Sequence, residues 1–456
     1  MSDWFEAERR AERAQQLSEA RRWAEALSEL EAALEIIPGN AMWLGHRGFL
    51  LDQLDEFELA VEAYALALER DPDDRDLLLA LAIDQLRVGR VDESLASFHR
   101  VTELHPDFEP GYCYQISAYA ELGDHEKAEE TFYVARQLRA ECPFCYYHMA
   151  LSLNDRGDHR RAIHCLERVL RIDPQFEGVR GLIAQAYRGL NDVEKARENY
   201  LIAIREDPGD VDLMSEFGDL LLESGDADGA AAKFRHVLEL STDHIDARFG
   251  LGRAALALDK LDTASEAFEH VRTVEPDYEG LDLHLGTVCL RQGRWDKARD
   301  HLAIAAADDP DDVQAQLLLG NCQLQLRRPA EAAEAFRRAI TLDPMLANAH
   351  HNLGVCCFLL DKHDEGIEHC RKAIELKPDY LMAIVKTTLA YQRIGRFREA
   401  RTMITYGLKV DPENAMFAQL RKRLWRVRLR YAFRRMLGWF VRSNRGSSAA
   451  APTVDG

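Results

Sequence analysis

The chain has 456 residues, of which 30% are charged and 47% are hydrophobic. This composition is typical of a soluble, folded protein and excludes a disordered, collagen-like or membrane-embedded chain. Acidic residues outnumber lysine and arginine by 78 to 58, which gives a formal net charge of −20. Because phosphates and anionic lipid headgroups repel such a body, binding to nucleic acid or to a membrane would need a local basic patch.

The nine cysteines are too sparse for a disulfide scaffold, which favours a reducing compartment. Residues 1–10 are charged and lead directly into a helical pattern, without the apolar core of a signal peptide. The longest uninterrupted apolar run, residues 77–83, is far shorter than the roughly 20 residues needed to span a bilayer. We therefore predict a cytoplasmic protein without a membrane-spanning segment.

A 34-residue period organises the chain from residue 7 to residue 414. Steps of 34 from Pro38 reach twelve lattice positions, and ten of them are proline although the chain has only 14 prolines. The other two lattice positions are Ala140 and Thr242. The lattice predicts twelve repeats over residues 7–414, without insertions or deletions between them.

Small and large residues alternate within each repeat. The residue 12 before each lattice position is always alanine, serine or glycine, and the residue 24 before it is mostly small, except Ile116 and Thr388. Eight residues before the lattice position, most repeats have a large side chain, such as Tyr64 or Phe268. Because small residues let two helices approach and a large one fills the space opposite, each repeat is predicted to be a pair of packed helices.

Turn residues separate the predicted helices. Six repeats have glycine 17 residues before the lattice position, where a left-handed conformation ends a helix. The lattice proline is often preceded by aspartate and is expected to end the second helix of the repeat.

This pattern resembles the tetratricopeptide repeat family over about nine-tenths of the chain. The resemblance implies an all-α fold, a right-handed α-solenoid (superhelix) of antiparallel helix pairs, with a concave groove lined mainly by the first helix of each pair. It also implies binding of peptides or proteins in that groove, without chemistry of its own. Such an array offers a long surface rather than a closed pocket, and the fold alone names no ligand.

Groove-facing residues of this family lie about 30, 27, 23 and 20 residues before the proline. Applied to repeats eight to twelve, that spacing predicts these partner-binding residues: Phe249, Arg253, Leu283, Thr287, Leu317, Asn321, His351, Val355, Val385 and Leu389. The middle of the stripe is apolar, so we expect a partner with an apolar face, such as an amphipathic helix. The alternative is that some of these side chains pack between neighbouring helices.

Two ligand modes known in the family lack their residues here. A carboxylate clamp needs lysine 27 residues before the proline, and the first five repeats have none there. An asparagine ladder, as in O-linked sugar transferases, could draw only on Asn321 and Asn352. The partner is therefore expected to be a protein or peptide recognised in another way.

Cys142 and Cys145 form the one cysteine pair with metal or redox spacing. A zinc site needs four ligands, so Cys113 would have to be recruited from the preceding repeat. The alternative is a chance spacing at the junction where Ala140 replaces proline.

A second group, in repeat eleven, comprises His350, His351, Cys356, Cys357, His363, His369 and Cys370. Since Cys357 and Cys370 fall on helix-packing positions, we predict no metal and no cofactor in the protein.

No common catalytic motif occurs, and the repeats leave no room for a catalytic domain. We predict that the chain is not an enzyme but a scaffold for protein partners. The alternatives are a recruiting or regulatory arm of a separately encoded enzyme, such as a glycosyltransferase, and an adaptor at a membrane surface.

Both ends differ from the repeats. Residues 1–6 are a lead-in, residues 415–442 are predicted to be a basic capping helix, and residues 443–456 a disordered tail. Residues 415–456 have a net charge of +9, whereas residues 1–414 have −29. One apolar stripe of the helix can cover the last repeat, while a second stripe is left over beside arginines. The expected contact residues of this tail are Arg421, Trp425, Arg428, Arg435 and Trp439.

Three roles fit the tail: a cap, a peripheral membrane contact through residues 421–442, or a helix that docks on acidic repeats. Nucleic-acid binding is not expected because the charge of the repeats opposes it.

Overall fold

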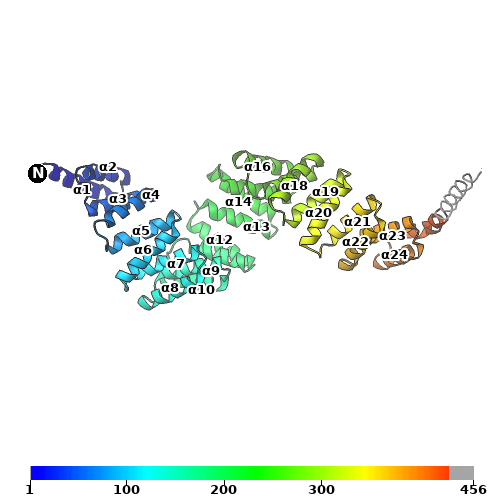
Figure 1. The fold of residues 1–456 in the computed structure, drawn as a ribbon, viewed down its shortest axis with the longest axis horizontal. Coiled ribbons are helices and arrows are strands. Elements are labelled where there is room, and N and C mark those ends of the chain that lie inside the picture. Colours follow the sequence, from blue (N-terminus) through cyan, green and yellow to red (C-terminus); the bar gives the residue numbers. More distant parts are fainter. Residues whose placement is uncertain (1, 431–456) are drawn as a thin grey trace, which may run out of the picture. The chain divides into compact units, whose positions relative to one another are not determined.

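The computed structural model describes residues 2–430, and every regular element within them is an α-helix (Figure 1). The chain divides into two compact bodies, Met1–Asp226 and Ala227–Gly456. We call them the N-terminal and C-terminal bodies. The predictions for Arg435, Trp439 and the disordered tail concern residues outside the described part of the chain.

The N-terminal body contains thirteen helices along its described residues. They are α1 (Ser2–Glu19), α2 (Trp23–Ile36), α3 (Ala41–Asp52), α4 (Phe57–Leu68), α5 (Arg75–Arg87), α6 (Val91–Leu104), α7 (Glu109–Glu121), α8 (His125–Leu138), α9 (Pro143–Asp155), α10 (His159–Ile172), α11 (Val179–Gly189), α12 (Val193–Glu206) and α13 (Val211–Glu223). Because α1 begins at Ser2, residues 2–6 of the expected lead-in belong to the first helix.

The C-terminal body begins with α14 and ends, in its described part, with a helical segment at residues 415–430. Its helices are α14 (Ala227–Leu240), α15 (Ile245–Ala257), α16 (Leu261–Val274), α17 (Leu281–Arg291), α18 (Trp295–Asp308), α19 (Val313–Gln325), α20 (Pro329–Leu342), α21 (Ala347–Leu359), α22 (His363–Leu376), α23 (Leu381–Ile394) and α24 (Phe397–Val410). In both bodies each helix packs on its neighbours in sequence. The expectation of an all-α solenoid of antiparallel helix pairs is confirmed.

Small residues bring the two helices of a repeat together. Each alanine or serine 12 before a lattice position is completely buried. Gly48 and Gly252, 24 before a lattice position, face the large side chains 8 before it. A Cβ atom on Gly48 would lie 2.6 Å from the Tyr64 ring, and one on Gly252 would lie 2.5 Å from the Phe268 ring. The predicted pairing of a hole with a large side chain is confirmed in these repeats.

Repeat eleven packs the same interface with different residues. Cys370 occupies the position of the large side chain, and a Cβ atom on Gly354 would lie 2.5 Å from its sulfur. Phe358 fills the remaining space, because a Cβ atom on Gly366 would lie 2.5 Å from that ring. Cys370 and Cys357 are completely buried, which confirms their predicted role in helix packing.

Left-handed residues end the first helices. All twelve residues located 17 before a lattice position have positive φ. Six are the predicted glycines; the other six are Arg21, Asp55, Asn191, Asp259, Arg327 and Asp361. After Gly89, for example, the Arg90 N–H donates to the Gln85 carbonyl at 2.8 Å, which closes the helix end. The turn geometry is therefore kept even where the side chain disfavours it.

The segment at residues 415–430 packs on the last repeat with one face. Phe417 is completely buried, and Leu420 and Leu424 contact the apolar clusters of α23 and α24. Trp425 and Leu429 remain 59% and 60% exposed. One apolar stripe thus covers the last repeat, and Trp425 and Leu429 of the second stripe remain largely exposed.

We expect Gly252→Ala to lower the free energy of unfolding of the C-terminal body by about 1–3 kcal/mol, because the added methyl group overlaps the Phe268 ring. The midpoint of urea unfolding, followed by far-ultraviolet circular dichroism, measures the effect. Gly39→Ala is the matched control, since the nearest atom to its Cβ lies 4.0 Å away. Equal midpoints for the two variants would contradict this account of the packing.

Candidate functional site

The predicted groove residues lie on α15, α17, α19, α21 and α23 of the C-terminal body. Three of them are buried: Phe249, His351 and Val385 are 8%, 7% and 6% exposed. Six are half-buried: Arg253, Leu283, Thr287, Leu317, Asn321 and Val355. Leu389 is 44% exposed. The structure therefore corrects the expected stripe, because three of its ten members offer little surface to a partner.

A contact between an aromatic pair explains two of the buried positions. The ring of Phe249 lies 4.7 Å from that of Tyr278, and the ring of His351 lies 4.8 Å from that of Tyr380. Each pair joins a first helix to the last residue of the same repeat, 29 residues later and just before the next first helix begins. Tyr147 and Phe176 in the N-terminal body repeat the contact at 5.2 Å. This spacing is present in the sequence and would have identified the positions as packing residues.

The exposed part of the stripe is clearest on α23. Met382 and Leu389 are 48% and 44% exposed and lie seven residues apart, so they occupy one face of the helix. The half-buried Lys386 lies between them in the sequence. On neighbouring first helices, Asn352 donates a hydrogen bond to Asn321 at 2.8 Å. These two asparagines therefore bind each other.

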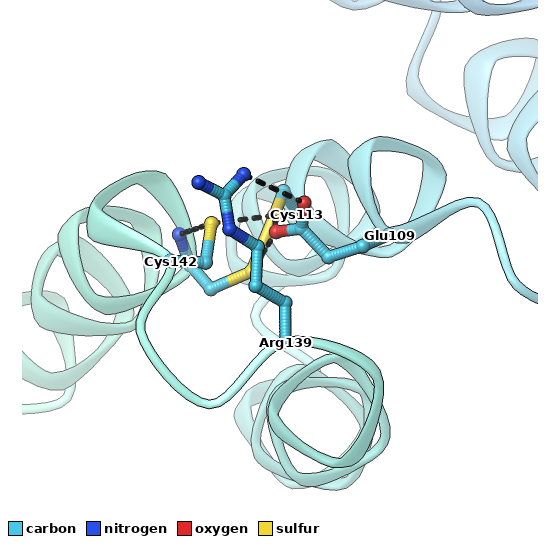
Figure 2. The surroundings of a disulfide bond; sticks show 5 residues. Glu109, Cys113, Arg139 and Cys142 are labelled. Carbon is cyan, nitrogen blue, oxygen red and sulfur yellow. Dashed lines mark hydrogen bonds and ion pairs between the residues drawn. A yellow bond between two sulfur atoms is a disulfide. The ribbon is translucent and has the colours of Figure 1, made fainter.

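The first helices of two repeats in the N-terminal body are joined by a cluster of cysteines (Figure 2). Cys113 of α7 and Cys145 of α9 form a disulfide with a Cα–Cα distance of 4.8 Å. The Sγ atom of Cys142 lies 3.5 Å from that of Cys113 and accepts a hydrogen bond from the Cys145 N–H at 3.3 Å. Cys142 thus caps the start of α9, at the place where Asp74 caps α5.

Glu109, in the first turn of α7, completes the cluster. Its Oε1 atom lies 2.6 Å from the Sγ atom of Cys113 and 3.0 Å from that of Cys145. Burial, followed by the nearby Glu109, raises the pKa of the Cys142 thiol to about 11. The structure places Cys113 beside Cys142 and Cys145, as the zinc hypothesis requires. Glu109 could not be found from metal-ligand spacing alone, because it is a single acidic residue 33 positions before Cys142.

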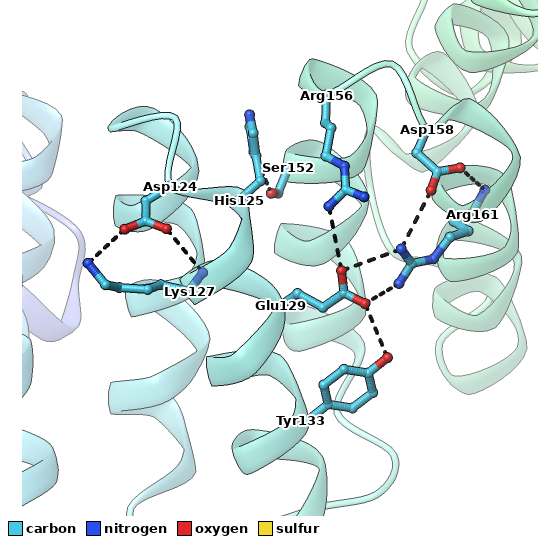
Figure 3. Close-up of polar contacts among 9 residues, drawn as sticks. All are labelled: Asp124, His125, Lys127, Glu129, Tyr133, Ser152, Arg156, Asp158 and Arg161. Atoms are coloured by element: carbon cyan, nitrogen blue, oxygen red, sulfur yellow. Dashed lines mark hydrogen bonds and ion pairs between the residues drawn. The ribbon is translucent and has the colours of Figure 1, made fainter.

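The polar group around Glu129 joins second helices of the N-terminal body (Figure 3). Glu129 of α8 accepts hydrogen bonds from Arg161 of α10 and from the Tyr133 hydroxyl, and Arg156 lies 3.7 Å away. The Arg161 guanidinium lowers the pKa of Glu129. Asp124, at the start of α8, accepts from the Lys127 N–H. Of these partly exposed pairs, those of Glu129 with Arg156 and Arg161 connect neighbouring repeats, and each adds little to stability.

Two cavities occupy equivalent places, three repeats apart. One cavity, of about 440 Å³, is lined by the Glu177-Gly178 loop, and the other, of about 620 Å³, is lined by the Glu279-Gly280 loop. In both loops the glycine has positive φ and precedes a short first helix. Acidic residues dominate their charged lining: Glu177, Glu206, Asp207 and Asp210 in the first, and Asp277, Glu279, Asp282, Asp308, Asp309 and Asp312 in the second.

The histidines of repeat eleven do not form a comparable metal group. His350 and His369 face each other, with their Nδ1 atoms 3.3 Å apart, and His350 also contacts the Pro344 carbonyl. Along the described residues, only Glu109, Cys113, Cys142 and Cys145 bring three or more possible ligands together.

No helix in the described part is long and apolar enough to cross a bilayer.

Comparison with known families settles the classification. Profiles described as "Tetratricopeptide repeat" match residues 44–74, 79–143, 153–215, 221–281, 283–347 and 347–380. The chain belongs to the tetratricopeptide repeat family. A curated relative, the Protein CTR9 homolog of Arabidopsis thaliana, is 24% identical over 255 residues. That match covers 46% of this chain, and the chain spans only 23% of the length of that relative.

Solved structures of tetratricopeptide repeat proteins resemble this chain as well. YrrB, described as a protein with an unusual peptide-binding site, is 26% identical, with 41% of this chain and 96% of YrrB covered and a TM-score of 0.37. The APC/C hetero-tetramer Cut9-Hcn1 gives 14% identity, 90% and 95% coverage and a TM-score of 0.46. Yeast Tom70 is 15% identical, with 94% of this chain and 96% of Tom70 covered and a TM-score of 0.37.

Burial gives His351 a measurable effect on stability. Burial, followed by the charge of Lys386, lowers its pKa from 6.5 to about 4. The unfolded chain therefore binds the proton more readily, and stability is lost as the pH falls from about 6.5 towards 4. We expect His351 to lower the free energy of unfolding by about 1–2 kcal/mol as the pH falls from 7 to 5.

His351→Phe should reduce this pH dependence, because phenylalanine fills the same space beside Tyr380 and cannot be protonated. Urea unfolding midpoints at pH 7 and pH 5 give the comparison, with the exposed His164→Gln as control. If both variants lose as much stability as the parent chain on acidification, the result would contradict a buried, neutral His351 in the folded chain.

Proposed function

We propose that the chain is a non-catalytic scaffold that holds peptides or helices of partner proteins along its first helices. Family membership supports a role in protein interaction. The observation that supports the site is the exposed apolar pair on α23, Met382 and Leu389, which lies on one helix face beside Lys386. The proposed contact residues are the accessible members of the predicted stripe: Arg253, Leu283, Thr287, Leu317, Asn321, Val355 and Leu389.

Charge narrows the chemistry of the partner. Residues 1–414 have a net charge of −29, and both cavities are lined by acidic side chains. Electrostatic complementarity favours a partner that presents basic residues beside an apolar stripe. An amphipathic basic helix combines both properties. Such binding should weaken as the salt concentration rises, because exposed charges are screened.

A photo-crosslinking residue at position 389 tests the site in the native cell. We expect partner proteins to be crosslinked from position 389 and not from position 274, because Val274 is 58% exposed at the end of a second helix. Affinity purification without crosslinking gives a second measurement. Met382→Glu combined with Leu389→Glu should abolish the capture of the same proteins, whereas Val274→Glu should leave it unchanged. Equal crosslinking at both positions, or none at 389, would refute this site. An enzyme among the crosslinked proteins would support the role of a recruiting arm.

The exposed Trp425 and Leu429 support a second candidate, contact with a membrane surface through residues 421–442. Arg421, Arg426 and Arg428 are exposed on the same segment. Its positive charge would attract anionic lipid headgroups despite the acidic repeats.

Flotation with vesicles that contain phosphatidylserine tests this candidate. The full chain should float with these vesicles at low salt, while a chain that ends at Asn414 and a Trp425→Ala/Leu429→Ala variant should stay behind. Neutral vesicles are the control. Flotation of the shortened chain, or of neither chain, would restrict the segment to its packing on the last repeat.

A further inference from the structure

Four possible metal ligands converge between α7 and α9. Glu109 and Cys113 lie one turn apart at the start of α7, while Cys142 and Cys145 occupy the start of α9. All four are buried, and one ligand atom of each lies within 4.8 Å of all the others. In a tetrahedral zinc site with Zn–S bonds of about 2.3 Å, the ligand atoms are about 3.5–3.8 Å apart. Small side-chain adjustments would therefore bring these atoms to zinc geometry.

The position of the Glu109 carboxylate is a second, independent observation. Its Oε1 atom is directed at the Sγ atoms of Cys113 and Cys145. Disulfide sulfurs have no hydrogen to donate, so in the oxidised form neither can satisfy this buried carboxylate oxygen. Two reduced thiols could donate to it, and a metal ion held by their thiolates would bind it directly. The Cys142 thiol also hydrogen-bonds to Glu109, so the carboxylate faces all three sulfurs of the cluster.

The surroundings suit a negatively charged metal complex. Three thiolates and one carboxylate would give a zinc complex a net charge of −2. The Arg139 guanidinium lies 3.8 Å from the Oε2 atom of Glu109 and offsets part of this charge. The Cys145 N–H already donates to the Cys142 sulfur at 3.3 Å, at the positive end of α9. Such outer contacts orient ligands and strengthen metal binding.

We propose that Glu109, Cys113, Cys142 and Cys145 bind one zinc ion when the Cys113–Cys145 disulfide is reduced. A dithiol reductant breaks the sulfur–sulfur bond, supplies two electrons and two protons, and becomes a disulfide itself. The two new thiols and the Cys142 thiol then release three protons as zinc binds. Glu109 supplies the fourth ligand as a carboxylate. The same junction is thus closed by a disulfide under oxidising conditions and by zinc under reducing ones.

The mixture of ligands selects the metal. Thiolates favour zinc, copper(I) and iron–sulfur clusters, while a carboxylate oxygen is a poor ligand for copper(I). Three sulfurs and one oxygen in a closed, buried site match zinc in a structural role. The site would hold together two helices that are in extensive contact, unlike the first helices of other adjacent repeats in this body. Zinc would therefore fix the local angle between repeats four and five.

Cobalt(II) titration of the full chain tests the site with a spectroscopic signal. The chain is reduced with a phosphine, freed of metal with a chelator and titrated with cobalt and then zinc. We expect one equivalent of cobalt with the intense visible bands of a tetrahedral thiolate complex, and their loss when zinc displaces it. The oxidised chain should bind neither ion at this site, because two of its ligands are in the disulfide.

Variants separate metal binding from disulfide formation. Cys142→Ser should leave the Cys113–Cys145 disulfide able to form and lower zinc affinity at least tenfold, and Glu109→Gln should also lower it at least tenfold. Cys356→Ser combined with Cys357→Ser is the control, since these buried cysteines lie outside the cluster. Circular dichroism checks the fold of each variant.

The proposal is overturned if the reduced parent chain gives no tetrahedral cobalt spectrum. It is also overturned if folded Cys142→Ser and Glu109→Gln variants bind zinc as tightly as the parent. The contrast between the oxidised and reduced parent chain decides the matter even where a variant does not fold. Because no partner protein takes part, the result is independent of the proposed scaffold function.

Discussion

The close approach of two helix backbones within each repeat is the constraint on which the rest of the structure depends. The residue 12 before the lattice position is small in every repeat, the residue 24 before it is small in ten of twelve, and a large side chain fills the space between them in most repeats. Once these contacts form, the remaining faces of the pair are apolar and can be covered only by the neighbouring repeats. Cys370, Phe358 and Gly366 show that the close contact is kept when the individual residues change.

The sequence predicts features that depend on position within one repeat. Pairing of helices, the turns and the buried cysteines of repeat eleven follow from spacing, because each repeat adopts the same local geometry. The six non-glycine residues with positive φ are not predicted by the glycine pattern; four are Asp or Asn, which tolerate this conformation, but Arg21 and Arg327 disfavour it. Their presence shows that packing on both sides of the turn outweighs a local preference of about 1–2 kcal/mol.

The candidate sites were predicted less completely, because they depend on the angle between repeats. Phe249 and His351 occupy family groove positions, yet their rings turn towards the aromatic residue that ends the same repeat, just before the next first helix. The cysteine cluster depends on extensive contact between α7 and α9, which no spacing within one repeat specifies. The sequence therefore offers Cys113 only as a hypothetical ligand and does not single out Glu109.

The absence of insertions over residues 7–414 has a consequence for how such a chain could change in length. Loss or duplication of one whole 34-residue segment would rejoin equivalent turns, so every new junction would resemble an existing one. The junction of repeats four and five is different, because Glu109, Cys113 and Cys142 of repeat four meet Cys145 of the very next repeat. An insertion between these two repeats would separate Cys145 from the other three side chains. At this junction the order of the repeats, and not only their number, is therefore fixed by the chemistry of the cluster.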